Sequence, residues 1–424
     1  MPDLPDLIPL DDAQRRVLDG IVPLEAVTVD IAAATGLALT APAHSPVTVP
    51  PWTNSAMDGF AVIGADVAAA TAAGPVELEV LGEVPAGRAP DEAVTPGAAL
   101  RIMTGAMLPP GADTVVPVED TDAPAGASDI PARVAVFAPT STGGNVRREG
   151  SDVAAGAQLL PAGRALDPAA IALLAATGQA TATVHRRPRV AVLSTGDELV
   201  PPGTALGPAQ IHESNSFTLA AQAAEAGAEV RRMGTAKDTL DDLLALVREA
   251  MAWGDVVVLS GGVSVGAHDH VKAAFGSVGT LDVWRVAIKP GRPFAFGRAS
   301  VDGRPVYLFG LPGNPVSVFV TFELFVRPVL RRLGGHTRIF DRPVRMVRLE
   351  ERIRGSSGRQ TVARVVLAAD PERPDGLVAR SSGGQDSHML FSLASANALL
   401  FVPPDTDLAA GGEAVAWELR GRDA

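Results

Sequence analysis

The chain has 424 residues, a formal net charge of -12 and no cysteine. A chain this acidic is a poor candidate for sequence-independent binding to nucleic acid, which needs a basic face. Because cysteine is missing, the chain itself contributes no disulfide, zinc–thiolate site, iron–sulfur cluster or cysteine nucleophile, and a bound metal would meet oxygen or imidazole ligands.

The length and the N-terminal segment set further expectations. At roughly 150 residues per domain, the chain should fold into two to four domains. The first residues, MPDLPDLIPLDDAQRR, are acidic and interrupted by proline, which is not the pattern of a signal peptide. No run of eighteen or more apolar residues lacks glycine or charge, so we expect no membrane span and a cytoplasmic location.

The pattern of apolar and turn-forming residues changes twice in the first half of the chain. Apolar patterns of helical and extended spacing predict a mixed N-terminal domain for linkage or dimerisation, formed by residues 1–50 together with 153–187. Its clearest helix is expected at 168–177, with Pro168 in the first turn. Between these parts, residues 51–152 carry short alternating runs such as VELEVL and RVAVF, separated by PAG, PPG and TGG turns. They predict a β-rich inserted domain.

The most regular part runs from residue 188 to 335, where apolar strands alternate with helices. This alternation predicts a central three-layer α/β domain with a mostly parallel sheet and helices on both faces. We expect strands at 189–195, 229–233, 255–260, 282–288, 294–297 and 306–310, and helices at 214–227, 239–254 and 315–330, the last bent at Pro328. Strand-like runs return in 336–424, which predicts a C-terminal small β-barrel, with a sandwich as the alternative.

Polar and glycine-rich loops follow the predicted central strands. Because the carboxyl ends of parallel strands meet at one edge of a sheet, these loops should converge there. Each loop alone is explained as well by an ordinary turn, but five at one edge favour a binding site. The five loops are Thr195–Glu198, Gly234–Asp238, Ser260–Asp269, Lys289–Pro293 and Leu311–Pro315.

Two of these loops offer uncharged donors to an anion. Consecutive glycines allow backbone N–H groups to face a ligand, and Ser264 adds a hydroxyl. Asn314 suits the N-cap position of the last helix and Pro315 its first turn, so a helix N-terminus should face the same edge. The glycines concerned are Gly261, Gly262 and Gly266.

The charged residues of these loops indicate the kind of ligand. Lys289 and Arg292 would neutralise phosphate or oxyanion charge. Glu198, Asp238 and Asp269 would repel such a ligand unless a divalent cation lay between them, which implies magnesium. We therefore expect a phosphorylated ligand, such as a nucleotide, with bound magnesium.

Six stretches of the sequence closely resemble the molybdopterin molybdenumtransferases, the final enzymes of molybdenum-cofactor assembly, whose animal relative forms the last domain of gephyrin. The likeness covers nearly the whole chain. The stretches are NSAMDGFAV (54–62), RIMTGAMLPPGADTVV (101–116), TGDEL (195–199), SGGVSVGAHD (260–269), KPGRPFAFG (289–297) and GLPGNPVS (310–317).

The resemblance implies an elongated homodimer of four-domain subunits, with the active cleft between the central domain of one subunit and the β-rich domain of the other. The implied reaction depends on magnesium: adenylylated molybdopterin is hydrolysed, molybdate is inserted at its dithiolene sulfurs, and AMP leaves. The absence of cysteine fits, because the pterin supplies the sulfur that molybdenum needs. The preceding adenylyltransferase and the molybdoenzymes that accept the product are further implied partners.

The resemblance also assigns roles outside the central domain. From the β-rich domain, Asp58 and Thr104 would orient the substrate across the dimer cleft, and Asp152 would join them. From the tail, Arg364 and Ser387 would reach the same site.

Within the central domain, Glu198, Asp238 and Asp269 would position magnesium and phosphate. Lys289 and Arg292, with Arg364 from the tail, would contact phosphates, the pterin or molybdate. The remaining substrate-binding positions implied by the motifs are Gly261, Gly262, Ser264, Gly266, Pro312, Gly313 and Asn314.

Three departures from the family pattern concern this site. Arg292 stands where a second lysine is expected, and its planar fork changes how an oxyanion would be held. In the tail, Asp386 stands where glycine is common, and Thr361–Val362 replaces a usual acidic or aromatic pair.

Two alternatives remain open at the level of sequence. The adenylyltransferase that acts one step earlier resembles the central domain alone, and residues 1–185 and 336–424, together with SGGVSVG in place of a TGGTG-like loop, argue against it. A non-catalytic scaffold resembling gephyrin, which uses the same dimer to bind partner peptides, is disfavoured by the full set of acidic and cationic residues.

Overall fold

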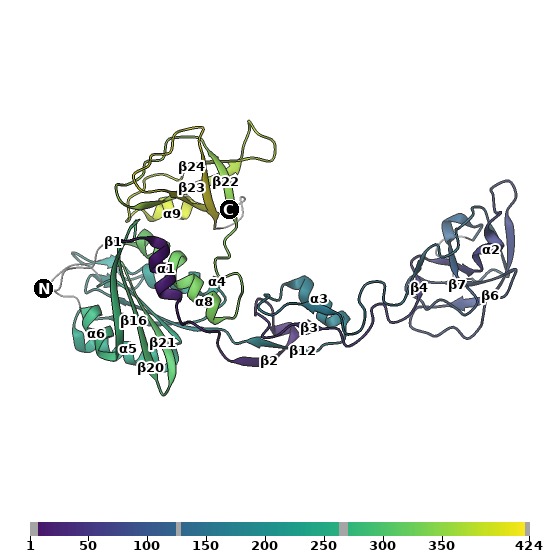
Figure 1. Cartoon of the computed structure of the whole chain (residues 1–424), viewed down its shortest axis with the longest axis horizontal. Helices are drawn as coiled ribbons and strands as arrows, with labels where there is room; N and C mark the ends of the chain where they lie inside the picture. Colours follow the sequence, from purple (N-terminus) through teal and green to yellow (C-terminus); the bar gives the residue numbers. More distant parts are fainter. Residues whose placement is uncertain (1–6, 124–128, 263–269, 420–424) are drawn as a thin grey trace.

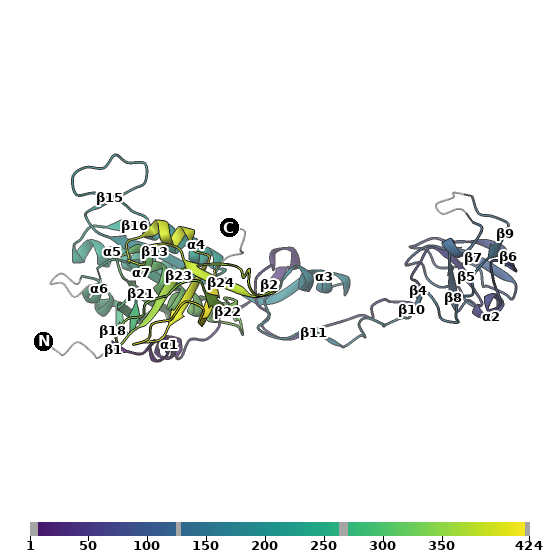
Figure 2. The same cartoon turned by 90° about the horizontal axis from the view of Figure 1, so that it is seen from above.

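The computed structural model describes residues 7–123, 129–262 and 270–419. A large body at one end and a smaller domain at the other are joined by a narrow connection, in which the chain passes out and returns (Figure 1). Figure 2 shows the same elongated arrangement from above. Every helix within the described ranges is too short or too polar to cross a membrane.

The body is built on a seven-stranded sheet. In spatial order its strands are β1 (Leu7–Ile8), β18 (Gly279–Val286), β20 (Pro293–Val301), β21 (Arg304–Leu311), β17 (Val256–Ser260), β13 (Arg189–Thr195) and β16 (Glu229–Ala236). Four of the six neighbouring pairs are parallel, whereas β20 runs antiparallel to both of its neighbours.

The sheet is mostly parallel, as predicted, but β20 makes it mixed, which the sequence did not predict. The reason lies in the connections of β20. Only residues 302 and 303 separate β20 from β21, and both have positive φ (50° and 81°), as in a tight hairpin turn. A parallel pair needs a crossover of a dozen or more residues, which neither this turn nor the segment between β18 and β20 supplies.

Helices cover both faces of the sheet, as predicted. On one face pack α4 (Asn215–Glu225), α7 (Pro315–Thr321) and α8 (Arg327–Leu333); on the other pack α5 (Leu240–Trp253) and α6 (His270–Val278). The side chains of β13 alternate between the two cores: Val190 and Val192 pack in one, and Ala191 and Leu193 pack in the other. A strand that is buried on both faces reads as a continuous apolar run.

The predicted helix at 315–330 extends to Leu333 and contains a π-helical turn, η3 (Phe322–Val326), between α7 and α8. Pro328 lacks the N–H that would bond to the carbonyl four residues earlier. The side-chain amide of Gln14 donates to that carbonyl, on Leu324, at 2.9 Å. The proline therefore creates an attachment point for the N-terminal helix.

Residues 7–21 belong to the body, although the sequence grouped them with residues 153–187. Strand β1 pairs with β18, and α1 (Leu10–Leu18) buries Leu10, Ala13 and Val17 in the same core as the helices beside it. Their spacing of three and four residues places them on one helical face.

The N-terminal unit forms the inner part of the narrow connection. It contains two ladders, β2 (Ala26–Asp30) with β12 (Thr181–His185) and β3 (Ala43–His44) with β11 (Gln158–Leu160), the short turn η1 (Ile31–Ala33), and α3 (Pro168–Ala176). The carboxylate of Asp167 caps α3 by accepting from the N–H of Ala170 at 2.8 Å. Where this unit joins the body, the Arg186 guanidinium donates to both carboxylate oxygens of the buried Asp255, at 2.6 and 2.9 Å.

The domain at the far end has a five-stranded sheet with the order β8 (Thr114–Pro117), β5 (Gly59–Val62), β7 (Ala98–Ile102), β6 (Val76–Val84) and β9 (Arg133–Val136). It also contains α2 (Gly64–Val67) and η2 (Val118–Asp120), and β4 (Asn54–Ser55) pairs with β10 (Val146–Arg147) where the chain enters and leaves. Small apolar cores lie on both faces of the sheet. This is the β-rich domain that the sequence predicts.

The C-terminal domain is a closed five-stranded barrel. Its strands β23 (Gln360–Ala369), β24 (Leu377–Ser381), β22 (Val344–Leu349), β26 (Glu413–Glu418) and β25 (Ala398–Val402) pair in that order, and β25 returns to β23. The helix α9 (Leu390–Ser395) lies beside it (Figure 1). A short central-domain strand, β19 (Ile288–Lys289), pairs with β23 and brings the barrel against the body.

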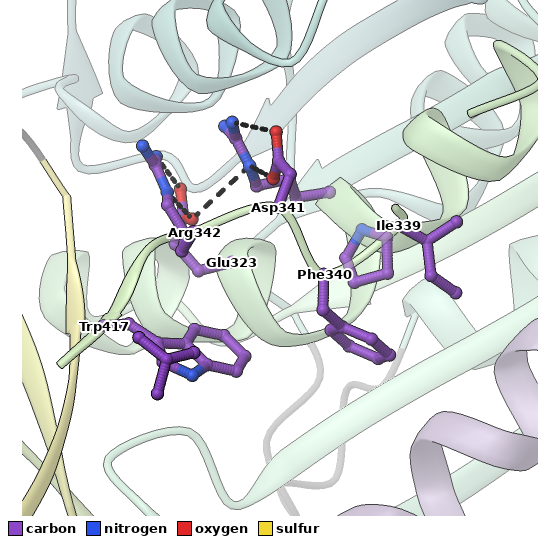
Figure 3. A pocket seen from close by; sticks show the side chains of 9 residues that line it. Glu323, Ile339, Phe340, Asp341, Arg342 and Trp417 are labelled. Carbon is purple, nitrogen blue, oxygen red and sulfur yellow. Dashed lines mark hydrogen bonds and ion pairs between the residues drawn. The ribbon is translucent and has the colours of Figure 1, made fainter. Parts of the chain in front are cut away.

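A network of buried charges fixes the segment that leads from α8 into the barrel (Figure 3). The carboxylate of Glu323, on the π-helical turn, accepts from Arg342 at 2.9 and 3.0 Å. Arg342 also donates to the carbonyl of Leu419, which follows the last barrel strand, at 2.9 Å. Arg327 pairs with Asp341 at 2.8 Å. These bonds hold the segment that enters the barrel, and the residue that follows its last strand, against the helix formed by α7, η3 and α8.

His336, just after α8, lies in a partly buried position and should make folding sensitive to acid. Burial, with the nearby charge of Arg331, lowers the pKa of His336 from 6.5 to about 4. Between these values the unfolded chain binds a proton that the folded chain rejects, so the free energy of unfolding should fall as pH decreases through this window. Chemical denaturation at neutral pH and at about pH 5 should show a smaller pH difference in His336→Gln than in the native protein.

The exposed His212 provides a matched control, because His212→Gln should keep the native pH dependence. An unchanged pH dependence in His336→Gln would contradict the assignment.

Candidate functional site

The carboxyl ends of three central strands lie side by side. Ser260, the last residue of β17, is in register with Ser194 of β13 on one side and Leu311 of β21 on the other. The loops that follow these strands therefore leave the sheet at the same edge, as the sequence predicts.

Gly261 and Gly262 bring backbone very close to neighbouring elements, Gly261 to β13 and Gly262 to α6. Their φ angles are +99° and +67°, in the left-handed region that favours glycine. A Cβ atom on Gly261 would lie 2.8 Å from the carbonyl oxygen of Thr195, and one on Gly262 would lie 2.5 Å from a methyl carbon of Val271. Side chains are thus excluded at both positions. The three other predicted residues of this loop, Ser264, Gly266 and Asp269, lie outside the described residues.

Asn215, the first residue of α4, links the loops after β17 and β21. Its side-chain amide donates to the hydroxyl of Ser260 at 2.9 Å and to the carbonyl of Gly313 at 2.7 Å. The Ser260 hydroxyl in turn reaches the carbonyl of Pro312 at 3.4 Å. Pro312 and Gly313 are therefore held at the predicted edge. Sequence reasoning did not select Asn215; the available signal was an asparagine that opens a helix facing this edge.

Asn314 occupies the N-cap position of α7, as predicted, but its side chain makes no capping bond. Its amide donates instead to the hydroxyl of Ser387 in the C-terminal domain, at 2.9 Å. The N–H of Val316, in the first turn of α7, donates to the carbonyl of Ser387 at 3.0 Å. Part of the helix N-terminus that the sequence offered to a ligand is thus used to hold the C-terminal domain.

The acidic loops lie beside the glycine edge. Glu198 follows β13 and Asp238 follows β16, and both side chains are exposed. The N–H of Asp238 donates to the carboxylate of Asp197 at 3.3 Å, which holds the two loops together. In the part of the chain that the structure describes, no three acidic or histidine side chains form a metal-binding group. The two carboxylates suit magnesium, which proteins often hold through one or two carboxylates together with substrate phosphates.

A cavity of about 400 Å³ lies between the central domain and the end of the barrel. Lys289 from β19 and Arg364 from β23 both line it. The side chain of Arg364 is completely buried, and burial lowers its pKa. Its Nη2 donates to the carbonyl of Gly384 at 2.6 Å, whereas its Nη1 has no partner among the described residues. The sequence predicted both cations but not the cavity that joins them.

The cavity contains further residues that sequence reasoning did not assign to the site. Arg352, Arg354 and Glu351 come from the segment after β22, and Thr361 comes from β23. Arg352 pairs with Asp407, and Glu351 accepts from the N–H of Ser381 at 2.8 Å. The only sequence signal was the departure at Thr361, because the segment after β22 matches no motif.

Arg292 is exposed and is not among the residues that line this cavity. Its carbonyl accepts from the N–H of Val286 at 3.0 Å. Its contact with an oxyanion, together with Lys289 and Arg364, stays a prediction.

In the β-rich domain, Asp58 and Thr104 form one unit. The Asp58 carboxylate accepts from the Thr104 hydroxyl at 2.7 Å and from its N–H at 2.6 Å. These two bonds lower the pKa of Asp58, so the carboxylate is ionised at neutral pH. Asp152 is exposed in the connection, where its N–H donates to the carbonyl of Val49 at 3.1 Å. Within one chain this domain lies far from the glycine edge (Figure 1).

Three parts of the chain match models of known protein families. Residues 191–332 match the family model described as a probable molybdopterin binding domain. The three-layer body therefore belongs to this class of domain. Residues 8–178 match the MoeA N-terminal region (domain I and II), and residues 346–419 match the MoeA C-terminal region (domain IV).

Several named proteins are similar to this chain over nearly its whole length. Molybdopterin molybdenumtransferase 2 of Mycobacterium tuberculosis is 41% identical, covering 97% of this chain and 99% of that protein. The molybdopterin molybdenumtransferase of Nostoc is 39% identical over 92% of this chain and 88% of its own length. A crystal structure of the molybdopterin biosynthesis protein MoeA from Pyrococcus horikoshii is 27% identical, with a TM-score of 0.79 over 97% of this chain and 100% of that chain. This chain belongs to the molybdopterin molybdenumtransferase family and is an enzyme of molybdenum cofactor biosynthesis.

Proposed function

We propose that the enzyme inserts molybdate into adenylylated molybdopterin and releases AMP in a magnesium-dependent reaction. The observation that carries this proposal is the cavity lined by Lys289 and the buried Arg364, which lies between β19 and the barrel. Two cations in one cavity suit an oxyanion, and the backbone at Gly261 and Gly262 suits a phosphate.

The central edge would hold the nucleotide end of the substrate. Glu198 and Asp238 would hold magnesium there, and the bound ion would neutralise the phosphate charge that these carboxylates otherwise repel. Asn215 keeps the Pro312–Gly313 backbone and Ser260 in fixed positions. The protein would thereby orient the phosphoanhydride for attack by water, which separates AMP from molybdopterin.

The molybdate end would lie in the cavity at the barrel. Lys289 supplies a mobile ammonium, and Arg364 a guanidinium with one unpaired nitrogen. Ser387 is held against Asn314 and would set the distance between the two halves of the cleft. The dithiolene sulfurs of the pterin would then replace oxygen ligands of the bound molybdate.

We propose that a second copy of the chain completes the site. Asp58 and Thr104 are exposed on a domain that is held away from the central edge of its own chain (Figure 1). An ionised carboxylate aligned by two hydrogen bonds, with no role in the core of its own domain, is suited to a cleft formed with a partner subunit. A homodimer with two such clefts would bring it to the substrate.

Turnover tests the proposed reaction. The purified protein, given adenylylated molybdopterin, magnesium and molybdate, should release AMP and form cofactor that activates a molybdenum-free apoenzyme. If no AMP is released and no active cofactor forms, while partner peptides bind tightly, the non-catalytic scaffold would be supported instead.

Magnesium dependence tests the acidic residues separately. Glu198→Gln should raise the magnesium concentration needed for half-maximal turnover by about tenfold, because one anionic oxygen ligand is lost. Calorimetric titration of magnesium into the protein with bound AMP should show the same loss. The exposed Glu249 on α5 is the control, and Glu249→Gln should behave like the native enzyme. An unchanged magnesium requirement in Glu198→Gln would remove Glu198 from the proposed site.

A further inference from the structure

We propose that the hydroxyl of Thr361 is a further oxyanion donor of the barrel cavity, beside Lys289. The inference rests on the proposed function, since it names a further residue for the molybdate end of the same site. Nothing in the sequence motifs assigns Thr361 this role.

The strand pairing places Thr361 next to Lys289. The two residues are directly paired in the parallel ladder of β19 and β23, so their side chains project from the same side of that ladder. Both line the cavity of about 400 Å³. A neutral hydroxyl and an ammonium are thus offered together to a ligand in this space.

Thr361 has a hydroxyl that the protein leaves unused. The residue is 8% exposed, and its Oγ1 has no hydrogen-bond partner among the described residues. A buried hydroxyl without a partner destabilises the folded state, and a bound acceptor would remove that cost. An unpaired hydroxyl beside the exposed ammonium of Lys289 indicates an acceptor from outside the chain.

The charges around the cavity favour an anion as that acceptor. Lys289 and Arg354, which both line the cavity, form no ion pair with any described residue. Glu351 also lines the cavity, but one of its oxygens is engaged by the N–H of Ser381 at 2.8 Å. A tetrahedral oxyanion offers four acceptor oxygens, so it can receive from a hydroxyl and an ammonium at once. Molybdate is the member of this class that the proposed reaction consumes.

The test is equilibrium binding of molybdate to the intact protein without pterin, measured by calorimetry. Thr361→Val keeps the shape of the side chain and removes only the hydroxyl, so it should weaken molybdate binding by about tenfold. Thr361→Ser restores the hydroxyl and should bind within about threefold of the native protein. The exposed Thr406, whose hydroxyl bonds to the carbonyl of Pro404, is the control, and Thr406→Val should bind molybdate normally.

The outcomes separate this inference from the proposed reaction. Equal molybdate affinity and equal KM for molybdate in Thr361→Val and the native enzyme would overturn the inference, even if turnover is normal. Failure of the native protein to bind molybdate at millimolar concentration would overturn it too. Hydroxyl-dependent molybdate binding in a protein that shows no turnover would instead support the inference and remove the proposed reaction. If Thr361→Val does not fold, Thr361→Ser must bind about tenfold more tightly than Thr361→Ala for the inference to stand.

Discussion

Replacement of Arg364 by methionine should lower kcat/KM for cofactor formation by about a hundredfold or more. Losing one partner of a buried charged contact costs roughly 2–5 kcal/mol, and each 1.4 kcal/mol is a factor of ten. Arg364 is the one completely buried cation among the described residues that line the cavity, and its Nη1 has no partner among them. Steady-state kinetics with molybdate as the varied substrate should show the loss mainly as a higher KM, since binding of the oxyanion is what Arg364 is proposed to provide.

A structural role of Arg364 has to be separated from this effect. Its Nε and Nη2 bond to Ser392 and Gly384, so Arg364→Met should also lower the melting temperature of the barrel. Arg364→Lys retains the charge without the planar fork and should recover part of the molybdate affinity but little of the stability. AMP binding at the central edge should be unchanged in both variants. Native KM for molybdate in a folded Arg364→Met protein would rule out the proposed contact.

Replacement of Asp58 by alanine should reduce turnover by a similar factor while leaving the β-rich domain folded. A preorganised charged group at a reacting centre typically contributes about 10²–10³ in kcat. Asp58 is exposed, aligned by Thr104 and held ionised by a lowered pKa, so its removal disturbs no core packing. Rapid-quench measurement of AMP release should show the decrease in the rate itself, with little change in molybdate affinity.

The control for Asp58 lies in the same domain. Asp91 is exposed and has no hydrogen-bond or ion-pair partner among the described residues, so Asp91→Ala should retain full activity. Full activity of Asp58→Ala would show that the β-rich domain does not contribute to the reaction.

Much of the fold was predictable because the apolar patterns are strong. Alternating strands and helices from residue 189 to 333 gave the three-layer body, and the positions of Pro168 and Asn314 marked helix starts. The antiparallel strand β20 was not predicted, since direction depends on the length of a connection and not on the pattern of a strand. The place of residues 7–21 in the body was also missed, because the partner strand lies more than two hundred residues away.

The site was predictable only where a loop followed a strand end. Gly261, Gly262 and the Pro312–Asn314 loop gather as the motifs imply. The side chain of Asn314 was misjudged, since its bond to Ser387 depends on how the barrel docks. For the same reason Arg354 gave no signal, and Thr361 stood out only as a departure from the family pattern: their chemistry arises from a cavity between two domains, and no local pattern encodes such a space.

In the proposed dimer, each active cleft combines the barrel cavity of one subunit with Asp58 of the other. Subunit complementation tests this arrangement: Asp58→Ala and Arg364→Met chains carrying different tags are co-expressed, and the mixed dimers are isolated. Each mixed dimer would contain one cleft with both residues intact, so the isolated mixed dimers should show about half of native turnover although each variant alone is nearly inactive. Isolated mixed dimers with no more activity than the single variants would contradict the shared cleft.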